Sequence, residues 1–198
     1  MKYTQVPANT FKEMQLNAGI LVKTFTPGTG VIGDILGATS GGVNFKATPT
    51  YSDFGEDIDN CPKNTMELKK LDSWEATMGG TMITVSAGNV KDLLGAADID
   101  DDDPTHIVPR NDILEEDFDD VWWVGDYSDF NGEKNGGFCA IHMKNALSTD
   151  GFQIQTTDKK KGTFAFTYTA HYSMKNTKQV PFEVYIKPGT AEDDGDML

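Results

Sequence analysis

The residues most able to do chemistry lie in an acidic block between Asp98 and Asp120. Eleven of its residues are Asp or Glu, and only Arg110 is Lys or Arg. Clustered carboxylates suit Ca²⁺, but an EF-hand loop needs glycine at its sixth position and glutamate at its twelfth. Counted from Asp98, these positions hold Asp103 and Pro109. We therefore expect a solvated acidic loop, with an adventitious divalent ion as the alternative.

Other motifs of known chemistry are incomplete. Residues 28–33 match G-x-G-x-x-G, but that fingerprint needs a helix opening at the third glycine, and further glycines follow instead. His106, His142 and His171 are isolated, with no His-Glu-x-x-His spacing and no serine elbow. The sequence therefore predicts a protein that is not an enzyme, with no catalytic, cofactor-binding or metal-ligating residues and no cofactor.

The charge balance argues against a specific DNA reader. The chain has 198 residues and a net charge of −14, with 31 acidic residues against 17 basic ones. Only one basic residue, Arg110, is arginine, whereas DNA readers rely on arginine forks and a positive surface. An acidic protein repels phosphate.

The start of the chain and its two cysteines indicate a cytosolic protein. Residues 2–7 contain no apolar run of the kind that a signal peptide needs. No segment reaches 18 consecutive apolar residues, so we expect no transmembrane helix. Cys61 and Cys139 lie far apart in the sequence, and we expect both to be buried or idle thiols.

The clearest element is a hairpin near the end of the chain. Residues 163–172 alternate aromatic side chains on one face with mainly threonines on the other, which is typical of a strand with one buried face. A polar turn at 158–162 separates it from a first arm at 151–157. Another strand is expected at 180–187, where Pro181 suits a strand start or a sheet edge.

The remaining chain predicts short strands and one helix. The helix is expected at 88–97, with Asn89 as its N-cap and an apolar stripe on one side. Residues 27–42 are expected to be a long glycine-punctuated loop, and the polar ends, 1–17 and 189–198, to be flexible. Further strands are expected at 18–25, 42–51, 66–71, 73–78, 81–86, 121–125 and 138–143, with a bulge or tight turn at Gly79-Gly80.

These elements predict an all-β fold in a single domain over residues 1–198. The expected architecture is an antiparallel β-sandwich or barrel with one flanking α-helix.

The order of the C-terminal elements resembles a family of phage proteins. It comprises a lysine-rich turn at 158–162, the Gly-Thr-Phe-x-Phe-Thr-x-Thr-x-His-Tyr strand at 162–172, and the Val-Pro-Phe-Glu-Val-Tyr-Ile strand at 180–186. This order resembles the major tail proteins that form the tail tube of long-tailed bacteriophages. The resemblance extends back to residues 17–21 and 37–45, so it covers most of the chain, although no single motif is specific.

The resemblance implies a structural virion protein with a tail-tube-like fold. Its subunits would stack as hexameric rings around a channel through which DNA passes as cargo without being bound specifically. Its partners would be other copies of itself and other tail proteins, such as the tape measure and the tail terminator, and no membrane. It would assemble in the cytoplasm of the host bacterium and reside in the virion tail. The net negative charge suits such a channel, because a wall that attracted phosphate would stall the genome.

Two groups of residues are candidates for this role. A solvated loop has no use for aliphatic side chains, so Ile32, Ile35 and Leu36 are expected either to touch a neighbouring subunit or to fold onto the subunit's own core. On the hairpin, the neutral hydroxyl residues Thr163, Thr167 and Thr169 would suit a wet, uncharged wall, so this hairpin is expected to line or build the tube.

Two alternatives remain open. Trp74, Trp122 and Trp123 beside many carboxylates could belong to a carbohydrate-binding β-sandwich, although adjacent tryptophans more often divide between a core and an interface. Another virion β-protein, such as a head decoration or tail completion protein, would share the same sequence features.

Overall fold

The structure of the chain is a computed structural model that describes residues 5–128, 130 and 135–190. Strands make up 47% of the chain and helical residues 10%, which confirms the all-β fold class with one flanking α-helix. In chain order the elements are η1 (Thr10–Glu13), β1 (Ile20–Val22), β2 (Phe25–Thr26), β3 (Val31–Ile32), β4 (Ile35–Gly37), β5 (Thr39–Asp53), η2 (Met66–Leu68), β6 (Lys69–Met82), α1 (Ala87–Leu94), β7 (Ala97–Ile99), β8 (Ile107–Pro109), η3 (Glu115–Asp117), β9 (Asp119–Asp126), β10 (Phe138–Ser148), β11 (Gln153–Gln155), β12 (Thr163–Ala170) and β13 (Phe182–Lys187).

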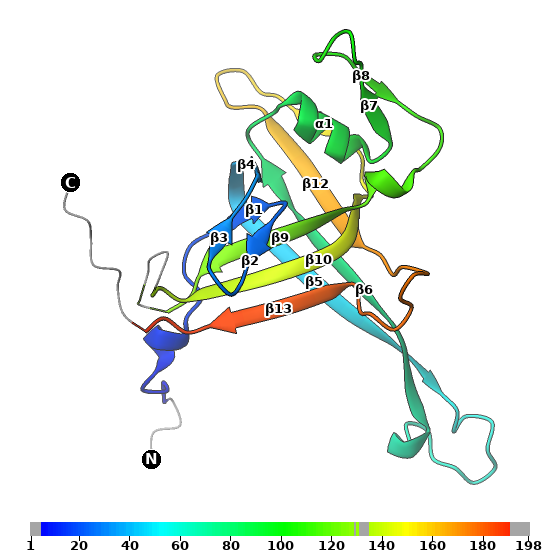
Figure 1. Cartoon of the computed structure of the whole chain (residues 1–198). Coiled ribbons are helices and arrows are strands. Elements are labelled where there is room, and N and C mark those ends of the chain that lie inside the picture. The colour runs from blue at the N-terminus through cyan, green and yellow to red at the C-terminus, as the bar shows by residue number, and fades with distance from the viewer. Residues whose placement is uncertain (1–4, 129, 131–134, 191–198) are drawn as a thin grey trace.

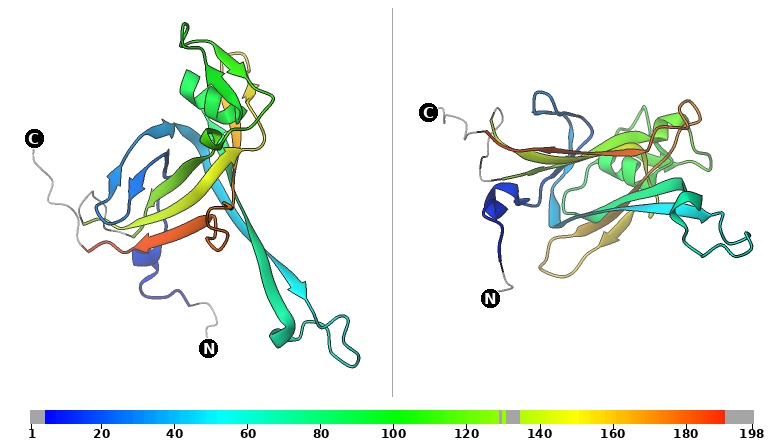
Figure 2. Two further views of the ribbon diagram at one scale, coloured as in Figure 1. Left: turned by 45° about the vertical axis from the view of Figure 1, so that its right-hand side comes forward. Right: turned by 90° about the horizontal axis from the view of Figure 1, so that it is seen from below.

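Nine strands form one large antiparallel sheet. Its order is β4-β1-β9-β10-β12-β6-β5, with β11 beside β12 and β13 beside β10. The first half of β10 pairs with β13 and its last residues pair with β12, so the sheet divides at this strand. The strands on either side of the division cross at a steep angle and form two layers (Figure 1 and Figure 2).

The space between the layers holds the main core. Phe182 of β13 packs against Phe45 and Trp74 of the other layer, with ring centroids 5.7 and 5.5 Å apart. Along β12 the aromatic residues Phe164, Phe166 and Tyr168 are buried, as their alternation predicts. The rest of this core comes from other strands and from α1: Leu21, Leu36, Ala76, Met78, Met82, Leu93, Val121, Met143, Ala146 and Ala170.

A second, smaller core lies on the outer side of β1, β9 and β10. The β2–β3 hairpin covers it and inserts Phe25, whose ring meets Trp122 edge-on at 5.5 Å and Phe138 at 5.0 Å. The two neighbouring tryptophans of β9 therefore serve different cores, because successive side chains of a strand point to opposite faces.

The single α-helix of the described residues is α1, which confirms the helix expected at 88–97 with shifted ends. Its N-cap is Ser86 rather than Asn89. The Ser86 hydroxyl accepts a hydrogen bond from the Asn89 N–H at 3.2 Å. The helix ends at Leu94 because Gly95 adopts a φ of 77°, which favours glycine.

The C-terminal hairpin is confirmed as the β11–β12 pair, in which Ile154 lies opposite Phe164. The strand expected at 180–187 is confirmed as β13, and it lies at a sheet edge with Pro181 just before it.

Three segments differ from expectation. No tight turn occurs at Gly79-Gly80, and β6 runs through both residues, while the pairing irregularity beside Gly80 lies on β5 between Thr39 and Val43. A Cβ on Gly80 would lie 2.9 Å from the Phe166 ring and 3.0 Å from the Gly42 carbonyl oxygen, so the glycine allows close approach rather than a bend. The expected loop at 27–42 contains β3, β4 and the start of β5, and residues 66–68 form η2 instead of a strand.

The β5–β6 hairpin extends beyond the rest of the sheet as an arm (Figure 1). Among the described residues, the part of β6 that precedes Thr77 pairs only with β5, and the tip of the arm comprises residues 54–68. Phe54, Ile58 and Met66 at this tip are exposed. A two-stranded ribbon has marginal stability in water when no other element packs against it.

The acidic block of residues 98–120 forms defined structure, with the β7–β8 hairpin and η3. Arg110 holds part of it together through ion pairs with Asp98 and Asp117.

Part of the N-terminal segment that was expected to be flexible is bound to the end of β9. There the Leu16 N–H donates to the Asp126 carbonyl oxygen at 2.8 Å. Residues 1–4 and 191–198, also expected to be flexible, lie outside the described residues. Within the described part of the chain, no helix has the length and apolar character needed to cross a membrane.

Candidate functional site

One side of the large sheet presents a broad, neutral surface, which we name the threonine face. The strands β5, β6, β12 and β11 lie side by side, and directly paired residues share a face. The threonine face comprises Asn44, Lys46, Thr48, Glu75, Thr77, Gly79, Thr81, Thr163, Ala165, Thr167, Thr169, Gln153 and Gln155.

The three predicted hairpin residues Thr163, Thr167 and Thr169 all lie on this face and are half-buried. Thr167 is opposite Gly79 and Thr169 is opposite Thr77. The structure therefore brings the predicted residues together with matching positions on β5 and β6, which the sequence analysis did not assign to the site. These positions on β5 and β6 could be found in the sequence as alternating polar residues. Only the strand register shows that β5, β6 and β12 share one surface.

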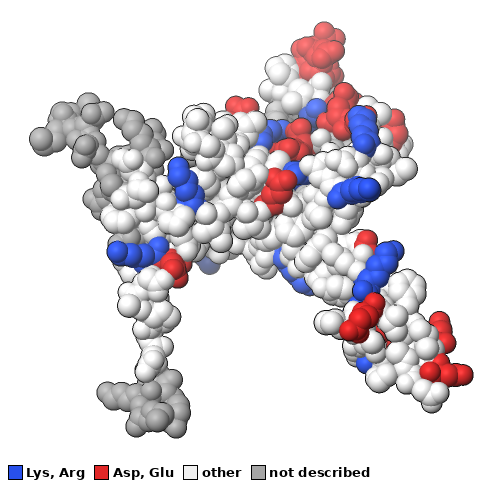
Figure 3. Space-filling view, turned by 60° about the horizontal axis from the view of Figure 1, so that its bottom comes forward, with Lys and Arg blue, Asp and Glu red and all other residues white. Residues whose placement is uncertain are grey.

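The threonine face carries little charge. Lys46 and Glu75 are its only ionic side chains, and the other side chains are hydroxyls, amides or a methyl group. Hydroxyls also bond to one another at its margin, where the Thr149 and Thr169 oxygens are 3.0 Å apart. Acidic residues gather instead on the part of the molecule that carries β7 and β8 and toward the end of the arm (Figure 3).

The threonine face ends at unpaired strand edges. In the part of the chain that the structure describes, β5 is the last strand of the sheet, and β11 pairs only with β12. Another free edge belongs to β13, on which Val184 and Ile186 are 50% and 60% exposed. Unpaired edges with exposed apolar side chains are surfaces on which another chain can pair.

The candidate interface residues near the start of the chain divide into two kinds. Ile32 and Ile35 are 45% and 64% exposed, as an interface would require. Leu36 is only 5% exposed and packs in the main core, so its assignment to the interface is wrong and its assignment to the subunit's own core is correct. The strand β4 separates these neighbours, because its successive side chains point to opposite faces.

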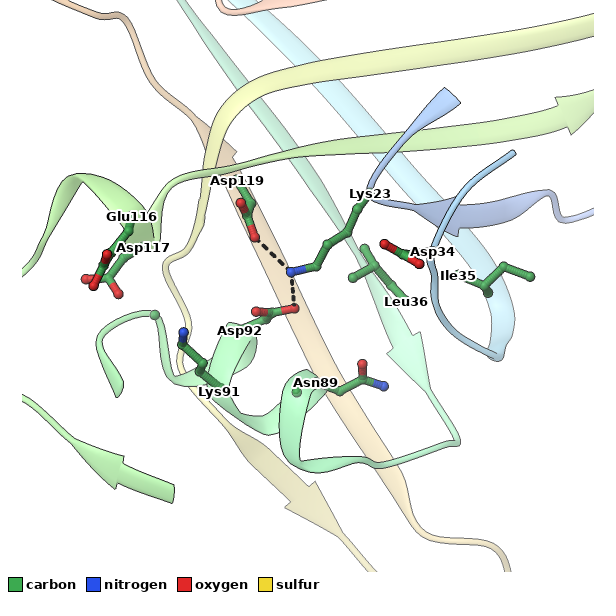
Figure 4. A pocket seen from close by; sticks show the side chains of 12 residues that line it. Lys23, Asp34, Ile35, Leu36, Asn89, Lys91, Asp92, Glu116, Asp117 and Asp119 are labelled. Carbon is green, nitrogen blue, oxygen red and sulfur yellow. Dashed lines mark hydrogen bonds and ion pairs between the residues drawn. The ribbon is translucent and has the colours of Figure 1, made fainter. Parts of the chain in front are cut away.

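A cleft of about 380 Å³ lies between β4, α1, η3 and β9 (Figure 4). Lys23 reaches across it, and its ammonium lies 3.0 Å from Asp92 and 2.8 Å from Asp119. Burial lowers the pKa of Lys23, but hydrogen bonds to the two carboxylates outweigh this and raise it above its usual value. The pKa of Asp92 is raised above its usual value, because burial raises it by more than the hydrogen bond to Lys23 lowers it.

A second cavity, of about 480 Å³, lies beside the β2–β3 hairpin. Ile32 lines it together with Phe25, Val124 and Phe138, and several glycines complete its wall. Its lining is mainly apolar, with Asn17, Asp126 and Lys187 as its polar side chains.

The tryptophans do not form an exposed stacking platform. Trp122 is 7% exposed and stacks on His142 with ring centroids 3.9 Å apart. Trp74 packs on Phe182, and the Trp123 indole N–H donates to the Ala18 carbonyl oxygen at 2.9 Å.

His142 belongs to a network of side chains that joins β9, β10 and β13. Its Nε2 lies 2.8 Å from Asp120, and its Nδ1 lies 3.9 Å from Glu183, which also pairs with Lys144. The hydrogen bond from His142 lowers the pKa of Asp120 below its usual value, with the Asn145 N–H adding to the effect. In the described ranges no three His, Cys, Asp or Glu residues are placed to hold a metal ion.

No protein-family model matches the chain, and no curated protein matches it.

Proposed function

We propose that this chain is the subunit of a phage tail tube, a structural protein that stacks as rings around a channel for DNA. The observation that carries the proposal is the threonine face: a sheet surface four strands wide, neutral apart from Lys46 and Glu75. Lysine and arginine side chains on a channel wall bind DNA phosphates and slow the passage of the DNA. A wall of hydroxyl and amide groups stays wet and holds no phosphate strongly.

The free edges support assembly into a ring. The threonine face ends at β5 on one side and at β11 on the other, and no strand of the described residues pairs with either outer edge. A contact between two different edges is heterologous, and repeated around an axis it closes a ring when the rotation permits. Such a ring would present the threonine faces of all its subunits to one lumen.

Exposed apolar residues supply further surfaces for contact between subunits. Ile32 and Ile35 lie near the β3–β4 turn, and Phe54, Ile58 and Met66 lie at the tip of the arm. Contiguous exposed apolar groups are typical of surfaces that a partner covers. In this proposal the tip of the arm packs against a neighbouring subunit, and no enzymatic activity is needed.

Electron microscopy of the concentrated protein tests the proposal. Negatively stained samples are expected to contain rings or hollow tubes. Ile35→Asp is expected to prevent their formation while the circular dichroism spectrum stays unchanged, because Ile35 is exposed in the subunit. A matched control is Met174→Asp, which places the same charge at a side chain that is 92% exposed on another part of the surface. Persistent monomers at high concentration would count against the tube.

The orientation of the wall needs its own measurement. Thr167→Cys, in a background of Cys61→Ser and Cys139→Ser, places a thiol on the threonine face. In assembled tubes this thiol is expected to react with a small maleimide and to resist one carrying a large polymer. Val108→Cys on β8 is the control on a surface outside the threonine face. Equal reaction of the two thiols with the large reagent would place the threonine face outside the lumen.

A further inference from the structure

The cleft of Figure 4 carries more negative than positive charge, because two lysines, Lys23 and Lys91, face five acidic side chains: Asp34, Asp92, Glu116, Asp117 and Asp119. Lys23 neutralises part of it by bridging Asp92 and Asp119. Asp34 and Glu116 also line the cleft, and neither has an ion-pair partner within the described residues. An added cation would therefore find two unpaired carboxylates at the rim.

A buried hydroxyl at the base of the cleft gives a second, independent sign of a ligand. Ser148 is 7% exposed, and its Oγ has no hydrogen-bond partner among the described residues. It lines a small space that Lys23, Asp92 and Asp119 also line, so this space continues the cleft inward. Buried hydroxyls are nearly always hydrogen-bonded, so this small space leaves room for a further hydrogen-bond partner of Ser148.

A lysine-rich turn of this chain offers the complementary charge. Lys159, Lys160 and Lys161 form the turn between β11 and β12, and all three are exposed. Of these, Lys161 reaches Ser40 at 3.2 Å, and Lys159 is 90% exposed with its ammonium 4.0 Å from the equally exposed Asp158. An ammonium group donates three hydrogen bonds and accepts none, which suits a cleft of carboxylate and hydroxyl acceptors.

We propose that the acidic cleft receives the Lys159–Lys161 turn of a second copy of this chain. The inference rests on the proposed function, in that it makes this pair of surfaces one of the heterologous contacts between subunits. The turn projects from the β11 end of the threonine face, so the contact would form where the neighbouring subunit meets that edge. Charge complementarity of this kind selects the register and partner of an interface.

Zero-length crosslinking tests the proposal on the full chain. Unlabelled and ¹⁵N-labelled protein are mixed, treated with a carbodiimide, digested and examined by mass spectrometry. The reagent forms an amide only between a lysine amine and a carboxylate in contact, with loss of water. We expect mixed-isotope peptides that join Lys159, Lys160 or Lys161 to Asp34 or Glu116.

Charge-reversal variants provide a second readout by sedimentation velocity. Variant A carries Lys159→Glu, Lys160→Glu and Lys161→Glu, and variant B carries Asp34→Lys and Glu116→Lys. These side chains are exposed, so both variants are expected to fold. Each is expected to self-associate about tenfold more weakly, or worse, at low salt. The variant with both sets of changes is expected to regain association, because the charges are exchanged.

Four results would overturn the inference. Crosslinks between these residues found only within one isotope would mean that the turn reaches its own cleft. Mixed-isotope crosslinks at other surfaces, together with tubes in the microscope, would leave the proposed function standing and exclude this contact. Spermidine that binds the cleft with unchanged self-association in variants A and B would assign the cleft to a small amine. Absence of both tubes and mixed-isotope crosslinks would remove the inference and the proposed function together.

Discussion

Two neighbouring residues of β4 should respond very differently to the same kind of truncation. Leu36 is 5% exposed within the main core, whereas Ile35 is 64% exposed. Leu36→Ala removes buried methyl groups and leaves a cavity, which typically costs about 2–5 kcal/mol. Ile35→Ala changes a surface side chain and should alter the free energy of unfolding by about 0.5 kcal/mol or less. Against a typical stability of about 5–15 kcal/mol, the first loss is large.

Urea denaturation followed by tryptophan fluorescence measures this difference. The two tryptophans of β9, Trp122 and Trp123, pack in or against the two cores, so their emission reports global unfolding. With an m-value of about 2 kcal/mol per M, the midpoint for Leu36→Ala should fall by about 1–2.5 M. The midpoint for Ile35→Ala should stay within about 0.3 M of the original.

The comparison can refute the reasoning in two ways. Equal midpoint shifts would mean that β4 does not separate its side chains between core and surface as described. A small shift for Leu36→Ala alone would mean that the main core does not depend on this side chain. Tube formation should be lost in the Ile35→Asp variant even though its subunit stays folded. Leu36→Ala should act on the stability of the subunit and not directly on assembly.

Three further predictions concern folding. Gly80→Ala should destabilise the protein by about 1–3 kcal/mol in urea melts because its Cβ would meet an aromatic ring and a carbonyl oxygen, whereas Gly28→Ala, with open space around it, should change little. Asp120 has a lowered pKa in the folded state, so the stability that it contributes is present above its unfolded-state pKa and is lost as pH falls through its folded-state pKa. Asp120→Asn should therefore make the melting temperature fall less steeply with decreasing pH in that acidic range. An unchanged slope of melting temperature against pH would contradict this. Arg110→Met should lower the urea midpoint because it leaves the buried side chain of Asp117 without its cation, while an unchanged midpoint would show that the carboxylate finds another partner.

The local pattern of the sequence was enough for elements whose neighbours in space are also neighbours in the chain. The alternation at 163–172 identified a strand with a buried aromatic face and a threonine face, and the structure has both in β12. The apolar stripe at 88–97 identified α1. Strands and helices differ in side-chain period, so a run of eight or more residues distinguishes them before any tertiary contact is known.

Patterns with two local explanations were decided by distant residues. Gly79-Gly80 fits a turn as well as a strand, and it is a strand because the Phe166 ring packs against it from β12. The helix cap differs for a local reason: it is Ser86 rather than the expected Asn89, because the chain enters the helix from Ser86 in extended form. Local preferences of this kind are worth about 1 kcal/mol, so tertiary packing overrides them.

The sequence by itself determined that this protein is rich in strands, strongly acidic and equipped with a threonine-bearing hairpin, because composition and period are local properties. The tertiary structure alone decided that β5, β6, β12 and β11 share one neutral face, that Leu36 is buried while Ile35 is exposed, and that Lys23 meets Asp92 and Asp119. Each of these depends on the register between strands far apart in the chain. A shift of one residue in that register moves every side chain of a strand to the other face, and no local pattern specifies the partner strand.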